Sequence, residues 1–189
     1  GSYHSDYIKH YDEKSNNLFF TAHGVNNQID PYYEHTYKVS LNGGVPKLLN
    51  KGNFNTMTYP SDNHRYFVNN FSRVNTTPES HLINSDGTVI MKLEKADLSA
   101  LFESGYQFPE TFKAKADDGI TDLYGVIYKP FDFDENKKYP LLEYVYPGPQ
   151  TESVNKSFSV RMDRLDRMAQ LGFIVITLGN RGGHPDRSK

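Results

Sequence analysis

The sequence predicts a mixed fold, in which two antiparallel β-propeller-like blades are followed by the first part of a parallel α/β sheet. Turn signals and strand-like runs repeat at a period of about 44 to 48 residues in the first half of the chain. A strand–helix–strand pattern follows in the second half. Aromatic residues make up 14% of the chain, with 14 Tyr and 12 Phe, which suits half-buried strands. We therefore expect a β-rich globular protein.

Residues 1–93 repeat a four-strand unit twice. Asn42-Gly43 and Asp86-Gly87 are hairpin signals at equivalent places in the two copies. Strands are expected at 7–11, 18–22, 35–41 and 45–49 in the first copy, and at 54–59, 66–70, 80–83 and 89–93 in the second. Four strands per repeat is typical of propeller blades, which need neighbouring blades to bury their faces. A single antiparallel sandwich with similar hairpins is the alternative.

Residues 94–110 are expected to form a linker that contains a short helix. The stretch 96–103 carries apolar residues at Leu98, Leu101 and Phe102, and Gly105 is placed to end the helix.

Residues 111–189 predict the N-terminal half of an α/β-hydrolase domain. A hairpin over 111–116 and 123–129 leads to a strand at 141–146, a helix over 157–171 and a second apolar strand at 173–178. This order matches the start of the α/β-hydrolase fold. The strand at 173–178 is so apolar that we expect both of its faces to be covered. We also expect one of its edges to be unpaired, so that the chain associates with itself or packs against the rest of a parent enzyme.

Composition and motifs narrow the function classes. The formal charge of −2 shows no basic excess for binding nucleic acid. No apolar run is long enough for a membrane segment, and the absence of cysteine excludes disulfides, thiolate metal sites and cysteine catalysis within this chain. No cofactor or metal site is expected, because phosphate-binding and H-E-x-x-H motifs are absent. The histidines without metal-type spacing are His4, His10, His23, His35, His64 and His81.

Three segments of the second half resemble, in order and spacing, the serine peptidases of the prolyl oligopeptidase and dipeptidyl peptidase IV family. They are DGITDLYGVIYKP, KKYPLLEYVYPGPQ and GNRGG. In the first half, DPYYEHTYKVSLNGG resembles the last propeller blades of that family. In that family the tyrosine of a Y-x-G-P turn donates its hydroxyl to the oxyanion. The resemblance implies this catalytic role for Tyr146, which begins the sequence YPGP, whereas a tyrosine at a strand end can also serve only in packing.

The resemblance implies a fragment of a serine-type exopeptidase of the dipeptidyl peptidase IV type. Such an enzyme would cleave short peptides after Pro or Ala through an acyl-enzyme, and its periplasmic or secreted location would be favoured. Its Ser, Asp and His are expected beyond Lys189, because no G-x-S-x-G motif occurs here, and the chain alone is expected to be inactive. The alternatives are a non-enzymatic propeller-type protein-binding module and an esterase or acylaminoacyl-peptidase-like hydrolase.

Two polar residues near the last strand invite a functional interpretation. Arg181 could contact a substrate, but a pairing with a nearby carboxylate that fixes its loop is the favoured interpretation. His184 is interpreted as structural or solvent-facing, because the family's catalytic histidine follows its serine. The Gly pairs 43–44 and 182–183 are expected where the backbone needs a positive φ or a close approach.

Overall fold

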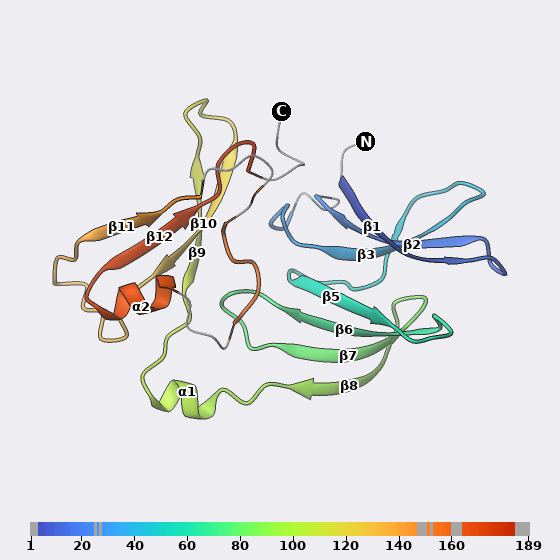
Figure 1. Ribbon diagram of the computed structural model, residues 1–189, viewed down its shortest axis with the longest axis horizontal. Helices are drawn as coiled ribbons and strands as arrows, with labels where there is room; N and C mark the ends of the chain where they lie inside the picture. Colours follow the sequence, from blue (N-terminus) through green and yellow to red (C-terminus); the bar gives the residue numbers. More distant parts are fainter. Residues whose placement is uncertain are drawn as a thin grey trace. The chain divides into compact units, whose positions relative to one another are not determined.

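β-Strands dominate the structure, a computed structural model that describes residues 4–24, 26, 28–146, 151, 153–159 and 164–183. The chain divides into two units (Figure 1). The first contains 1–73 and 78–96, and the second contains 74–77 and 97–189. No helix in the described ranges is long and apolar enough to cross a membrane.

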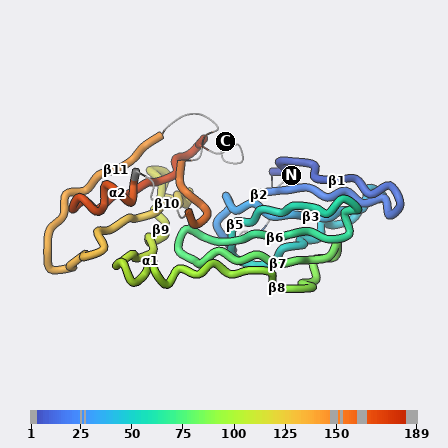
Figure 2. The backbone as a smooth tube through the Cα atoms, turned by 60° about the horizontal axis from the view of Figure 1, so that its bottom comes forward, coloured from blue at the N-terminus to red at the C-terminus, as the bar shows by residue number. Residues whose placement is uncertain are grey.

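The first unit holds two four-stranded antiparallel sheets, as the repeat predicts. The strands of each sheet follow one another side by side along the chain (Figure 2). The first sheet contains β1 (His4–Asp12), β2 (Asn17–His23), β3 (His35–Ser40) and β4 (Lys47–Leu48). The second contains β5 (Asn55–Pro60), β6 (Tyr66–Ser72), β7 (Glu79–Asn84) and β8 (Val89–Lys95). All eight strands lie where the sequence predicts strands, with small differences at their ends.

A buried apolar cluster and a buried amide join these two sheets. Phe19 of β2 and Leu49, which directly follows β4, pack with Phe67 and Ile83 of the second sheet, and all four side chains are fully buried. Asn50 accepts a hydrogen bond from the Thr36 backbone at 2.9 Å, and its amide donates to Thr56 Oγ1 at 2.7 Å and Asn69 Oδ1 at 3.0 Å. These hydrogen bonds favour one packing of the two sheets, because a different packing would leave buried polar groups without hydrogen-bond partners.

The second unit contains one mixed sheet and the helices α1 and α2. Its elements are α1 (Ser99–Glu103), β9 (Glu110–Lys115), β10 (Asp122–Tyr128), β11 (Leu141–Tyr144), α2 (Arg164–Gln170) and β12 (Ile174–Leu178). The spatial order is β11-β12-β10-β9, and β11 and β12 are parallel while the other pairs are antiparallel. The antiparallel sheets of the first unit and this mixed sheet confirm the predicted fold class.

The core of the second unit lies between the sheet and α2. Val126, Tyr128 and Val175 of the sheet pack against Leu165 and Ala169 of the helix. Ala169 is completely buried, and so small a side chain lets the helix come close to the strands. Gly172, with φ of +93°, follows the helix, and its N–H donates to the Ala169 carbonyl at 3.0 Å, as expected for a glycine that ends a helix.

Four details of the sequence prediction are wrong. β12 has no unpaired edge, because it is hydrogen-bonded to β10 and β11, and β11 lies at the sheet edge instead. Only one face of β12 is buried, since Val175 and Thr177 alternate with half-exposed neighbours. Residues 157–159 are not helical, and α1 begins at Ser99 rather than at residue 96.

The turn glycines meet the conformational demands expected of them. Gly43, Gly44 and Gly182 have φ of +102°, +126° and +85°, and a Cβ on Gly183 would lie 2.9 Å from Asn180 Oδ1. Gly87 has φ of +81° and also abuts the first sheet, because a Cβ there would lie 2.4 Å from the Leu49 carbonyl oxygen.

We predict that Gly87→Ala destabilises the first unit much more than Gly43→Ala does. Both changes strain a left-handed backbone, which costs about 1–2 kcal/mol, but only the Gly87 change forces a methyl group into the Leu49 backbone. The expected losses are about 1 kcal/mol for Gly43→Ala and about 3 kcal/mol for Gly87→Ala, measured by urea unfolding. Equal losses in the two variants would contradict this packing.

Candidate functional site

The candidate site lies where β11 and β12 end. These strands run parallel, with Tyr144 beside Thr177, so their carboxyl ends meet at one edge of the sheet. Val145 and Tyr146 follow β11 at this edge, and Gly179 and Asn180 follow β12. The carboxyl edge of a parallel strand pair is the usual place for ligands in open α/β sheets.

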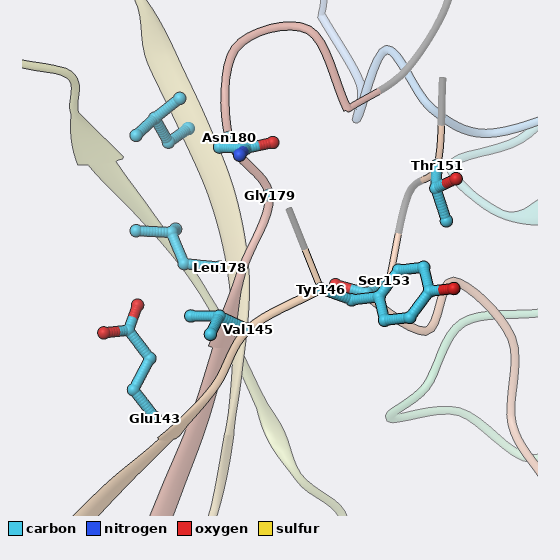
Figure 3. Close-up of a pocket in the computed structure, with 9 residues that line it drawn as sticks. Glu143, Val145, Tyr146, Thr151, Ser153, Leu178, Gly179 and Asn180 are labelled. Atoms are coloured by element: carbon cyan, nitrogen blue, oxygen red, sulfur yellow. The ribbon is translucent and has the colours of Figure 1, made fainter. Parts of the chain in front are cut away.

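An open pocket occupies this edge and encloses about 470 Å³, part of it open solvent. Its lining combines apolar side chains with the polar groups of Glu143, Tyr146, Thr151, Ser153 and Asn180. Figure 3 shows these residues, with the Tyr146 ring extending away from Glu143. The pocket can therefore offer hydrogen-bond donors and acceptors beside an apolar surface.

Tyr146, the catalytic residue predicted from the sequence, is 56% exposed and lines this pocket. Its neighbour two residues earlier differs, because Tyr144 is half-buried against the core of the second unit. The exposed phenol is accessible to a bound group, and a neutral phenol can donate one hydrogen bond without carrying a charge. The rest of the predicted turn, Pro147 to Pro149, lies outside the described residues, and so does His184.

The loop after β12 is held at both ends. The Gly179 N–H donates to the Tyr124 carbonyl at 3.0 Å, and the Gly183 N–H donates to the Asn180 carbonyl at 3.3 Å. Arg181 Nη1 lies 3.0 Å from Asp118 Oδ2, in the turn between β9 and β10. This ion pair confirms the loop-fixing interpretation of Arg181.

Asp118 is the centre of that turn. The Thr121 hydroxyl donates to its Oδ2 at 2.6 Å, and the backbone N–H groups of Ile120 and Thr121 donate to its Oδ1 at 2.9 and 2.8 Å. These hydrogen bonds lower the pKa of Asp118 to about 2, with the Thr121 hydroxyl as the largest cause and Arg181 as the smallest. The carboxylate therefore stays ionised and available to Arg181 over the whole neutral and mildly acidic range.

In the first unit the structure gathers residues that no sequence motif connects. Asp6, His23 and Glu34 place their ligand-type atoms within 4.8 Å of one another. They come from β1, from β2 and from the residue before β3. Their separation along the chain follows no metal-binding pattern, so sequence spacing gives no signal for this group.

Comparisons with known proteins match this chain to parts of dipeptidyl peptidases. A family model described as "Dipeptidyl peptidase IV (DPP IV) N-terminal region" matches residues 1–78. Human dipeptidyl peptidase 8 is 44% identical over 78 residues, which are 41% of this chain and 9% of the relative. A protein named as a dipeptidyl-aminopeptidase B from Tuber melanosporum is 27% identical over 184 residues, or 90% of this chain and 19% of the relative.

A solved structure extends the likeness over nearly the whole chain. A crystal structure described as a dipeptidyl aminopeptidase IV from Bacteroides ovatus covers 96% of this chain with a TM-score of 0.75 and 26% identity. The chain in turn covers 25% of that structure and at most 19% of these two curated relatives. Together these matches support the dipeptidyl peptidase IV and prolyl peptidase family, so the family predicted from the sequence is confirmed.

We predict that Thr121→Val raises the pKa of Asp118 more than Arg181→Gln does. The valine removes the hydroxyl that contributes most to the lowered pKa, whereas Arg181 contributes least. The stabilisation from Asp118 is present above its unfolded-state pKa of about 3.9 and is lost as pH falls towards 2, so Thr121→Val moves this loss to higher pH. A carboxyl NMR titration measures both shifts, and a larger shift in Arg181→Gln would contradict the assignment.

Proposed function

We propose that this chain forms part of a serine-type dipeptidyl peptidase and that Tyr146 donates a hydrogen bond to the oxyanion formed during peptide cleavage. The observation that carries the proposal is the exposed Tyr146 phenol in a pocket at the carboxyl end of β11. The printed names of the relatives support the peptidase class, and the YPGP sequence supports the role of the tyrosine.

In the proposed reaction the role of Tyr146 is to donate one hydrogen bond. A serine oxygen adds to the peptide carbonyl, and the carbonyl π electrons move onto its oxygen, which becomes an oxyanion. The phenol O–H donates to this oxygen more strongly as charge develops, so it stabilises the transition state more than the ground state. When the carbonyl reforms, the amine leaves with a proton and the acyl-enzyme remains. In this proposal the parent enzyme supplies the serine and its base.

Substrate choice is the finer part of the proposal. The pocket places Leu123 and Leu178 beside the polar groups of Ser153 and Asn180, which suits an extended peptide with small apolar side chains. Cleavage after Pro or Ala is the specificity that the family resemblance implies.

The edge of the mixed sheet supports an association with further protein. β11 is an edge strand; Leu141, its first residue, is 61% exposed, and Val145, which follows its last residue, is 58% exposed. An apolar edge with unpaired backbone groups is stabilised by another strand. We propose that the rest of the parent enzyme supplies this strand and that the isolated chain associates with itself instead.

We predict that Tyr146→Phe lowers kcat of the complete protein that carries this sequence by about 100- to 1000-fold with little change in KM. The change removes one hydroxyl and keeps the ring. Tyr66→Phe is the matched control, because Tyr66 is an exposed tyrosine of β6 in the first unit, and its kcat should equal that of the wild type. Steady-state hydrolysis of a dipeptidyl chromogenic substrate measures both. Unchanged kcat in Tyr146→Phe would contradict the proposed role.

A further inference from the structure

One end of the first sheet brings a buried histidine and two carboxylates together. Ser5 pairs with Ala22, and Ala22 pairs with His35, so the start of β1, the end of β2 and the start of β3 lie side by side. Asp6, His23 and Glu34 are next to these paired residues, and their nitrogen and oxygen atoms lie within 4.8 Å of one another.

A backbone hydrogen bond decides which nitrogen of His23 faces the two carboxylates. His23 is 9% exposed, and its Nδ1 lies 3.1 Å from the Tyr32 carbonyl oxygen. A carbonyl oxygen can only accept, so Nδ1 donates its proton and the lone pair of a neutral ring is on Nε2. A hydrogen bond from the second ring nitrogen to a backbone carbonyl is the usual support of histidine metal ligands.

The Nε2 atom faces a carboxylate. Nε2 lies 3.4 Å from Asp6 Oδ2. Two lone pairs at this separation repel each other unless a proton or a cation lies between them. Asp6 lies in a stretch of β1 where the register with β2 shifts between Ser5 and Ile8, and such bulges redirect a side chain.

Glu34 adds a second carboxylate to this group. Its carboxylate forms no hydrogen bond or ion pair with any residue in the part of the chain that the structure describes. The two carboxylates and the imidazole together offer a divalent cation three ligand atoms, and the cation would balance the carboxylate charges.

We propose that Asp6, His23 and Glu34 bind a divalent transition-metal ion of the Zn²⁺ type at this end of the first sheet. An imidazole with two carboxylates suits Zn²⁺, whereas Mg²⁺ and Ca²⁺ prefer oxygen ligands alone. Ligand atoms at about 2.1 Å from one ion are at most about 4.2 Å apart, so small side-chain rotations complete the site. The ion would tie three strands together, which is a structural role separate from the peptidase chemistry of Tyr146.

The test is a titration of the full 189-residue chain with Zn²⁺ by calorimetry, with Mg²⁺ and Ca²⁺ in parallel. We expect one saturable Zn²⁺ site and a rise in Tm of about 5–10 °C at 100-fold excess over the dissociation constant. Asp6→Asn, Glu34→Gln and His23→Gln should each weaken Zn²⁺ binding at least about tenfold.

His81→Gln is the matched control. His81 Nε2 also lies 3.4 Å from a carboxylate oxygen, that of Glu79, but no second carboxylate in the described part of the chain completes a group of three ligands with this pair. Zn²⁺ affinity should therefore be unchanged in His81→Gln. Because a variant could alter folding, the wild-type chain provides a second readout, in which Zn²⁺ should shift the NMR signal of the His23 Nε2 nitrogen.

Three outcomes of the titrations would overturn the proposal. They are the absence of saturable Zn²⁺ binding, binding that survives unchanged in all three ligand variants, and Mg²⁺ or Ca²⁺ binding as tight as that of Zn²⁺. A His23 signal that Zn²⁺ leaves unmoved would overturn it independently of any substitution.

Discussion

The second unit depends on the hydrogen bonding of β12 along both of its edges. β12 lies antiparallel to β10 and parallel to β11, and one register fixes both pairings. A slip of one residue would exchange the buried Val175 and Thr177 for their half-exposed neighbours, so the burial pattern maintains the register. This register in turn determines that Tyr146 and Asn180 leave the sheet at the same edge.

Neighbouring atoms that lie close to Gly125 also help to fix the position of β10 in the sheet. A Cβ there would lie 2.4 Å from the ring of Phe112 and 2.7 Å from the Thr177 carbonyl oxygen. Only glycine allows β10 to stay between these two neighbours, and the ring of Phe112 then covers the backbone where a side chain is missing. The first unit is stabilised differently, because the buried amide of Asn50 and an apolar cluster join its two sheets.

Local chemistry explains why much of the fold was predictable from sequence. Hairpin turns such as Asn42-Gly43 and the alternation of apolar residues act over a few positions, and they indicate the strands of the first unit correctly. The central place of β12 was not predictable in this way, because strand order is decided by pairings between distant segments. The start of α2 is also missed, since residues such as Phe158 continue a helical spacing without being helical.

The features of the candidate site also differ in whether the sequence predicts them. Tyr146 follows an apolar strand, so its exposed position at the sheet edge can be inferred from sequence. The partner of Arg181 cannot, because Asp118 is 63 residues away along the chain. The group of Asp6, His23 and Glu34 comes from three segments that meet only after the first sheet has formed.

The central claim is that the Tyr146 hydroxyl contacts the oxyanion. It is tested most directly by a crystal structure of the complete protein with a peptide boronate bonded to its nucleophilic serine. The tetrahedral boronate places an oxygen where the oxyanion forms. We predict that the Tyr146 hydroxyl lies about 2.7–3.1 Å from this oxygen. A boronate oxygen held by other donors, with the phenol turned away from it, would contradict the account.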